Sequence, residues 1–247
     1  MFNREAWIPY CGSAPIPAEI FGRWNLDPIL LLALGLAVLL VMRYPDMRAL
    51  ERRVAIGAIG LALVLFVSPF CALTSALFSA RAVHHLFLTA ILPPMLIAAF
   101  PRLVPLAGGA LSWTTAHALV FWAWHVPQAY AWALASDLAY WLMQATLWLS
   151  ALALWSAIRR APVTSAVAAL LGTMVQMGLL GALLTFAQSA LYAPHFIGPI
   201  AWGLSPLEDQ QLAGLIMWAP GAGIYLAAAI ALLARSFARE RAATLAG

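Results

Sequence analysis

Hydrophobic residues form long runs along this chain, and short polar or Pro-containing stretches separate the runs. A helix needs roughly 20 apolar residues to cross a bilayer core about 30 Å thick. Only helices and closed barrels satisfy their backbone hydrogen bonds in lipid, and long unbroken apolar runs favour helices. The pattern therefore predicts seven membrane-spanning helices, at residues 26–43, 54–74, 83–100, 105–126, 138–158, 163–187 and 209–235.

The connections between these runs are short, charged or rich in Pro and Gly. The segment 1–25 is a polar, Pro-containing lead-in to the first span, and 188–207 is the longest connection. Such an arrangement predicts a single membrane domain over residues 1–247, an all-α bundle of about seven transmembrane helices.

Composition strengthens this prediction and excludes several classes of protein. Hydrophobic residues make up 64% of the chain and charged residues 9%, with a mean hydropathy of +0.91. A soluble domain is about 45–50% apolar and about 25% charged. A soluble enzyme, a nucleic-acid-binding domain and a disordered protein are therefore excluded. No P-loop, nucleophile elbow, HExxH or Rossmann glycine pattern appears, so no motif indicates enzymatic turnover.

The few charges predict the orientation of the bundle. All 13 basic residues are arginines, and cytoplasmic loops of membrane proteins carry the excess of basic residues. One set of connections contains Arg43, Arg48, Arg52, Arg53, Arg102, Arg159, Arg160, Arg235, Arg239 and Arg241, whereas the other contains Arg4, Arg23 and Arg81. Acidic residues are distributed the opposite way. We therefore expect the N-terminus outside and the C-terminus in the cytoplasm, which an odd number of spans requires.

This topology places both cysteines and most histidines at the outer side. The residues concerned are Cys11, Cys71, His84, His85, His125 and His195, whereas His117 lies nearer the middle of its span. Each has an ordinary structural interpretation. Cys71 could be a small apolar filler, and Cys11 a free thiol or the disulfide partner of Cys71, which an outer compartment permits. A histidine at a helix end could be an interfacial hydrogen-bonding group. Adjacent residues point about 100° apart on a helix, so we expect only one of His84 and His85 to face the bundle.

Taken together, the same residues suggest a metal site. Thiolates and imidazoles favour Cu(I) or zinc over harder metals, and ionisable groups within a membrane protein commonly mark a functional site. The candidate ligands are Cys11, Cys71, His84, His85 and His125. Thioether contacts could come from Met95, Met174, Met177 and Met217, although ordinary packing explains these as well. No regular zinc-type spacing is present.

Two other groups have simpler expected roles. Asp137 and Asp209 begin the fifth and seventh predicted spans, where a carboxylate complements the helix dipole, so we expect them to cap those helices. The 11 tryptophans suit the two interfacial belts of a membrane protein.

Several strings together resemble the polytopic CtaG family of cytochrome c oxidase assembly factors from the bacterial inner membrane. They are PYCG from Pro9, SARAVHHL from Ser79, WHVP from Trp124, QMGLLGALLTF from Gln176 and DQQLAGLIMW from Asp209. The resemblance covers nearly the whole chain. It implies a seven-span protein of the inner (plasma) membrane that helps to mature the oxidase by handling copper. Its expected partners are oxidase subunits or other assembly factors.

The chain departs from the family pattern at two places. Relatives carry a histidine at the position of Arg81, and an H-x-x-E-H motif on the fifth span where this chain has Tyr140-Trp141-Leu142-Met143-Gln144. The family's full histidine set therefore cannot be present unchanged, and Cys11 and Cys71 could replace some of its ligands.

Three hypotheses follow. The leading one is an oxidase assembly factor, or metallochaperone, with an outer-facing Cu(I) site built from Cys11, Cys71, His84 or His85, and His125. The second is a haem- or quinone-binding membrane protein, with axial ligands among His84, His85, His117 and His125. The third is a metal-free scaffold that docks oxidase subunits. A transporter is less favoured, because neither inverted repeats nor paired broken helices are apparent.

Overall fold

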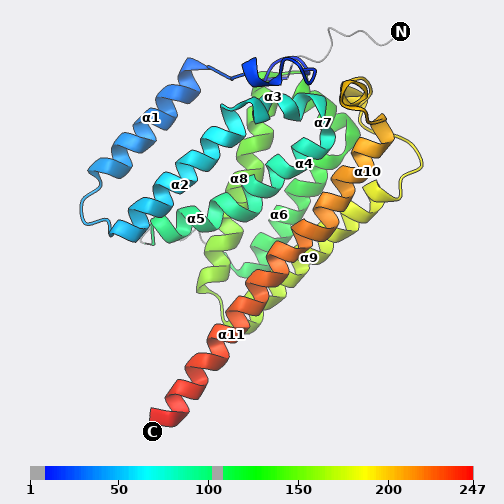
Figure 1. The fold of residues 1–247 in the computed structure, drawn as a ribbon. Helices are drawn as coiled ribbons and strands as arrows, with labels where there is room; N and C mark the ends of the chain where they lie inside the picture. Colours follow the sequence, from blue (N-terminus) through cyan, green and yellow to red (C-terminus); the bar gives the residue numbers. More distant parts are fainter. Residues whose placement is uncertain (1–8, 102–107, 247) are drawn as a thin grey trace.

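The computed structural model describes residues 9–101 and 108–246, and all regular elements within these ranges are helical. Figure 1 shows an elongated bundle, with α1 on one flank beside α2 and with α11 extending beyond the other helices at the bottom. The α-helices are α1 (Pro28–Arg43), α2 (Ala49–Phe66), α3 (Pro69–Ala76), α4 (Phe78–Leu86), α5 (Leu92–Ala99), α6 (Ala110–His125), α7 (Pro127–Leu134), α8 (Asp137–Arg160), α9 (Val163–Thr185), α10 (Pro206–Ile216) and α11 (Ala222–Ala246). Short 3₁₀ turns are η2 (Ile20–Gly22), η4 (Ala193–His195) and η5 (Gly198–Trp202), and two π-helical turns are η3 (Phe87–Ile91) and η6 (Met217–Gly221).

Each predicted apolar run coincides with helical structure, but the helices differ in their capacity to cross a membrane. Within the described residues, the helices long and apolar enough are Phe78–Ala99, Asp137–Arg160, Val163–Thr185 and Pro206–Leu245. The pair α2 and α3, bent by 45°, would make a fifth span. By contrast, α1 and α6 each have 16 residues, and the predicted start of the fourth run at 105 lies outside the described residues. The structure thus supports four or five spans.

The second and third runs break at different places from those predicted. Ser68 accepts a hydrogen bond from the Phe70 N–H (3.2 Å), and Pro69 follows at the first position of α3, so the long helix ends and restarts there. Next, α3 ends at Ala76 and α4 begins at Phe78. The string SARAVHHL is therefore helical and continues into α5, although its polar residues had suggested a connection before residue 83.

A π-helical turn joins α4 to α5 for a reason visible in the sequence. Pro93 has no N–H, so it cannot donate to the carbonyl of Thr89 four residues earlier. That carbonyl instead accepts a hydrogen bond from the indole Nε1 of Trp155 on α8 (3.0 Å). The freed backbone acceptor is thus satisfied by a neighbouring helix, as a membrane interior requires.

The helix that contains the last predicted span, 209–235, is longer than that span. The helix runs continuously over Pro206–Leu245, which is 40 residues and about 60 Å at 1.5 Å per residue. Hydrophobicity falls near Arg235, but the sequence after it contains no helix breaker, so the helix continues (Figure 1). The connection before this helix matches the prediction, since residues 188–205 hold only the short turns η4 and η5 among loop segments.

Close contact between two glycines sets the packing of α9 against α10. A methyl group placed on Gly214 would lie 2.5 Å from the carbonyl oxygen of Gly181, and one on Gly181 would lie 2.7 Å from the carbonyl oxygen of Gly214. The two backbones therefore touch at this point, which only glycine permits at both positions. This contact holds α10 against α9, and α10 in turn packs on α4.

Candidate functional site

A disulfide marks one end of the bundle. Cys11 and Cys71 are bonded to each other, with their Cα atoms 5.4 Å apart, and both side chains are buried. This outcome confirms the disulfide among the alternatives for Cys11 and excludes two free thiols in this state.

We call the end of the bundle that contains the disulfide the disulfide end; it also contains α7 and the connection 188–205. The arginine end is the opposite one, with the turn 44–48 and the C-terminal ends of α5 and α8.

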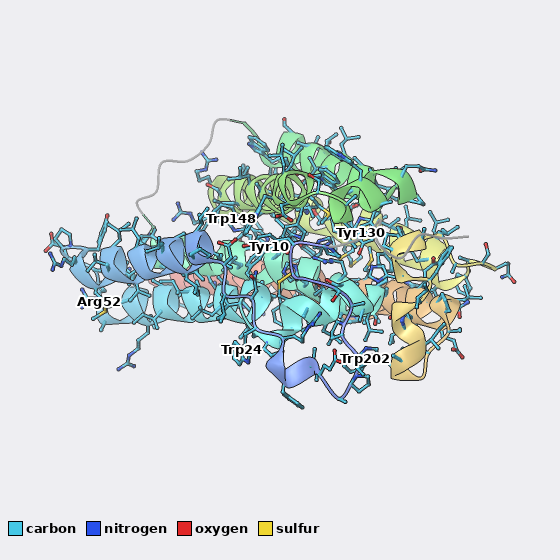
Figure 2. The ribbon with its side chains drawn as sticks, turned by 90° about the horizontal axis from the view of Figure 1, so that it is seen from above. Tyr10, Trp24, Arg52, Tyr130, Trp148 and Trp202 are labelled. Carbon is cyan, nitrogen blue, oxygen red and sulfur yellow. A yellow bond between two sulfur atoms is a disulfide. The ribbon has the colours of Figure 1, made fainter. Side chains whose placement is uncertain are left out.

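The disulfide fastens residues 9–27, which we call the N-terminal strap, across the disulfide end (Figure 2). Two further hydrogen bonds secure the strap: Trp202 Nε1 donates to the Pro15 carbonyl (3.0 Å), and Asn25 Nδ2 donates to the Phe66 carbonyl (3.0 Å). Tyr10 stacks on Tyr140 of α8, with ring centroids 5.1 Å apart. Its burial there raises the pKa of Tyr10 to about 12, so its hydroxyl stays protonated at neutral pH.

Beneath the strap, α4 carries His84 and His85 into the interior. The exposed fractions are 0% for His84 and 3% for His85, so both rings are buried and the expectation that only one faces the bundle is wrong. The reason is that α4 is a central helix, packed against α3, α10 and both π-helical turns. Neither ring nitrogen of His85 or of His84 makes a hydrogen bond of standard geometry with the described residues.

His125, at the end of α6, lies next to this pair. The ring centroids of His85 and His125 are 6.2 Å apart, and those of His84 and His85 are 5.8 Å apart. The Nδ1 of His125 lies 2.7 Å from the Phe121 carbonyl, which fixes that nitrogen as the donor and leaves Nε2 with a free lone pair. A backbone carbonyl in this position orients histidines that ligate metals.

Arg81 is the unexpected member of the site. The sequence placed it among the outer arginines, but its side chain is completely buried on α4, one turn before His84 and His85. Its Cζ lies 5.4 Å from the Tyr140 ring centroid, and its Nη2 donates to the Thr74 carbonyl (3.3 Å). Within the described residues it forms no ion pair, and its Nε and Nη1 make no hydrogen bond of standard geometry. The site therefore contains a positive charge that makes no direct ion pair with a carboxylate among the described residues.

The remaining histidines have structural partners. His117 is a buried residue of α6, and its Nδ1 is 2.9 Å from Ser150 Oγ of α8. His195 is buried in the connection 188–205, with Nε2 2.7 Å from the Tyr130 hydroxyl and Nδ1 3.3 Å from the Ala76 carbonyl. Burial, reinforced by the nearby charge of Arg81, lowers the pKa of His195 to about 3, so its ring is neutral at physiological pH.

The two aspartates act in different ways. Asp137 is the first residue of α8 and directly follows the N-cap Ser136. Its carboxylate therefore lies where it complements the positive end of the helix dipole. Asp209 caps a different helix from the one expected. Its carboxylate accepts hydrogen bonds from the backbone N–H groups of Phe78 (2.6 Å) and Ser79 (3.1 Å) at the start of α4. The hydroxyl of Ser79 donates a third, at 2.5 Å. The aspartate of α10 thus fixes the helix that carries the histidine pair.

Sequence reasoning missed two residues of α8. Tyr140 is completely buried, and its hydroxyl lies 3.6 Å from the Sγ of Cys11. Gln144 is one turn further along the same face, and its buried side-chain amide makes no hydrogen bond with the described residues. The spacing of four residues between these two polar side chains, within an apolar span, is the signal that could have identified them.

Metal coordination by this site requires rearrangement. The described residues contain no group of three or more His, Cys, Asp or Glu side chains already arranged to hold a metal ion. The histidines fit a metal, because His84 and His85 are buried and their ring nitrogens make no hydrogen bond of standard geometry with the described residues. The cysteines fit one only after reduction of the disulfide, since thiolate is the form that ligates metals.

The fold and the site together define a class: an all-helical membrane protein whose polar core is a cluster of imidazole, phenol and guanidinium groups beneath a disulfide-fastened strap. A family model of cytochrome c oxidase caa3 assembly factors (Caa3_CtaG) matches residues 36–239, and the chain therefore belongs to this family. Comparisons with curated proteins and with solved structures gave no match. Cys71 and the histidines lie inside the matched region, whereas Cys11 precedes it.

Proposed function

We propose that this protein assists cytochrome c oxidase assembly by holding a copper ion as cargo at the disulfide end of the bundle. The family assignment supports the assembly role. The observation that supports copper handling is the burial of His84 and His85: neither ring makes a hydrogen bond of standard geometry with the described residues, and His84 has only a weaker contact with the Leu65 backbone. A buried polar atom without a partner costs about 1–3 kcal/mol, so such a pair favours a ligand that satisfies it.

The spacing of the three rings is compatible with shared coordination. An imidazole nitrogen lies about 2 Å from a bound metal, which places two rings that share one metal with centroids about 6 Å apart. The separations of 5.8 Å for His84 and His85 and 6.2 Å for His85 and His125 are of this size. His85 is therefore the central ligand of the proposal, with His125 offering its Nε2.

The disulfide and Arg81 make copper binding depend on redox state. Coulomb repulsion from the buried guanidinium disfavours a cation held by neutral imidazoles alone. Thiol–disulfide exchange with a dithiol reductant would convert the Cys11–Cys71 bond into two thiols and oxidise the reductant to its own disulfide. The resulting thiolates would offset the charge of Arg81 and supply the soft ligands that Cu(I) prefers. Tyr140 connects these groups, because it contacts both Cys11 and Arg81.

The proposal also includes the orientation and the seven spans. We assign the disulfide end to the outer face of the bacterial inner membrane, because disulfides persist in oxidising compartments. The opposite end carries Arg43, Arg48, Arg52, Arg53, Arg159 and Arg160, as a cytoplasmic face does. In this orientation the bent pair α2–α3 and the shorter helices α1 and α6 complete the bundle as spans. Cysteine-labelling or reporter-fusion mapping of the N- and C-termini tests this: both on one side would contradict it.

Metal analysis of the purified protein tests the copper proposal. We expect one copper per chain after loading with Cu(I) in the presence of a thiol reductant, and much less without the reductant. His85→Ala and Cys71→Ser should both lose the copper, whereas His117→Ala, which removes an imidazole bonded to Ser150, should keep it. Stoichiometric copper in both His85→Ala and Cys71→Ser would contradict the proposal.

A metal-free scaffold is the second candidate. It is favoured by the absence, within the described residues, of three converging metal-ligating side chains. It predicts that oxidase assembly in cells survives His85→Ala and Cys71→Ser together.

Haem binding is a further alternative. It predicts a Soret band in the absorption spectrum of the purified protein, and a colourless preparation would exclude it.

A further inference from the structure

A cavity lies at the arginine end, far along the bundle from the histidine cluster. It is a groove of about 690 Å³ between α1, α2 and α5, and we call it the α1 groove. Its walls are almost wholly apolar. The residues that form them include Leu40, Val41, Ala55, Ile59, Leu96 and Phe100. A volume of this size is typical of sites that bind small organic ligands.

The α1 groove exists because α1 packs on α2 and leaves its other faces open. Small residues line the floor, with Ala55 and Ala99 each 1% exposed, so the helices leave space between them. Tyr44 and Phe100 meet edge to face across one side, with ring centroids 6.0 Å apart. Apolar side chains of α1 are widely exposed around the groove, Leu40 at 60%. In a membrane-spanning protein these surfaces face the acyl chains of lipids.

Basic side chains lie at the mouth of the α1 groove. Arg43 lines it directly, and Arg48 is bound to Glu51 of the groove wall. Arg159 of α8 donates from Nη1 to the carbonyl of Pro101, a residue of the groove wall (3.0 Å), which brings another guanidinium to the rim.

Acidic side chains do not cancel this charge. Glu51, which lines the groove, binds Arg48 through Oε1, at 2.8 Å from Nε and 2.5 Å from Nη2. Asp46 is the other acidic side chain of the turn between α1 and α2. Arg43, Arg48 and Arg159 thus outnumber the two carboxylates beside the groove. The combination of an apolar trough and a cationic mouth is complementary to an acyl chain attached to a phosphate.

We propose that the α1 groove is a binding site for an anionic phospholipid, with an acyl chain between α1 and α5 and the phosphate at Arg43. Basic pockets between helices on the cytoplasmic side are suited to anionic headgroups, and guanidinium groups bind phosphate oxygens in pairs. The lipid fills the space that the small side chains leave and holds α1 against the bundle. This inference is independent of the copper proposal, because it involves neither the histidines nor the disulfide.

Lipid titration of the purified full-length protein tests the site. Phosphatidylglycerol and phosphatidylcholine with identical acyl chains are added to the detergent-solubilised protein, and retained lipid is counted by native mass spectrometry. We expect preferential retention of phosphatidylglycerol. Arg43→Gln should weaken that retention about fivefold, the effect of removing one arginine near an anionic headgroup. Arg235→Gln, the same charge change on α11, should leave it unchanged.

A second pair of variants tests the apolar trough. Ala37→Phe places a ring in the α1 groove from α1 and should abolish specific retention of phosphatidylglycerol, whereas Ala33→Phe, one turn earlier and outside the groove wall, should not. Equal retention of the two lipids by the wild-type protein, or unchanged retention in Ala37→Phe, would overturn the proposal. A lipid-independent dimer that Ala37→Phe dissociates would assign the groove to a second copy of the chain instead.

Discussion

The hydrogen bonds that Asp209 accepts from the start of α4 connect two helices that are distant in sequence, and removing them should lower the stability of the protein considerably. Asp209→Ala leaves the N–H groups of Phe78 and Ser79 and the hydroxyl of Ser79 without their acceptor inside the bundle. Phe78 is 2% exposed and Ser79 is 5% exposed, so water replaces the carboxylate poorly.

The magnitude follows from these three bonds. A hydrogen bond to a charged group contributes about 1.5–3 kcal/mol, and a carboxylate at a partly buried helix N-terminus adds up to about 2 kcal/mol. The three bonds share one carboxylate and are not additive. We therefore expect Asp209→Ala to lower the free energy of unfolding by about 3–5 kcal/mol, most of it at the junction of α3 and α4.

The adjacent residue provides a matched control. Glu208 is exposed and closes a capping box with Ser205 on its own helix, where the Ser205 N–H donates to Oε2 at 2.7 Å. Glu208→Ala should cost only about 1 kcal/mol, as the loss of a helix cap does. The two alanine variants thus remove neighbouring carboxylates, of which one caps α4 and the other caps α10.

Unfolding by a denaturing detergent in mixed micelles, followed by tryptophan fluorescence, measures both variants. Hydrogen exchange at Phe78 and Ser79 supplies the local readout, because these amides lose protection in Asp209→Ala and keep it in Glu208→Ala. The reasoning is refuted if Asp209→Ala is no less stable than Glu208→Ala and the two amides stay protected.

Three further outcomes are expected. Gly214→Ala should destabilise the protein by about 1–3 kcal/mol in the same unfolding assay, because its methyl group overlaps backbone; Gly223→Ala, with open space around its Cβ, should not destabilise it. Reduction should lower the stability of the wild-type protein by up to about 4 kcal/mol, because the disulfide joins residues 60 positions apart, and should leave Cys71→Ser unaffected. The depressed pKa of His195, about 3, means that only the unfolded chain binds its proton between about pH 6.5 and 3. The free energy of unfolding should therefore decrease as the pH is lowered through this window, by up to about 1.4 kcal/mol per pH unit, and less steeply in His195→Gln. Equal pH dependence of stability in both proteins would disprove the role of this ring.

The sequence predicted the helices well, because apolar runs of bilayer length have few alternatives. It predicted their ends poorly. The start of α4 was missed because Ser79 and Arg81 have the polarity of a connection, and the cap that begins this helix, Asp209, lies far along the chain. The end of α11 was missed because hydrophobicity ends near Arg235 while the helix continues. Helix ends of this kind depend on tertiary partners or on the absence of breakers, which hydrophobic runs do not report.

The grouping of the candidate cysteines and histidines was predictable from the sequence, whereas their bonding state and their neighbours were not. The scarcity of cysteine and histidine singled out Cys11, Cys71, His84, His85 and His125, and the fold does bring these residues to one end. Whether two cysteines bond to each other or to a metal depends on a distance of a few ångströms between segments separated by two helices, which no sequence pattern encodes. The same is true of Arg81, whose burial beside Tyr140 reverses the expectation of an exposed outer charge.

The helix Pro206–Leu245 is continuous through the π-helical turn η6, so a rotation of one end displaces the other. Near one end it is held by Asp209 against the helix of the histidine pair, and at the other it extends past the remaining helices with Arg239 and Arg241. Asp209 and Arg241 are separated by about 48 Å along the helix axis, so a tilt of about 5° at the fixed end displaces the arginines by about 4 Å. A given tilt of this helix at its Asp209 end would therefore produce its largest displacement at the arginine-bearing end.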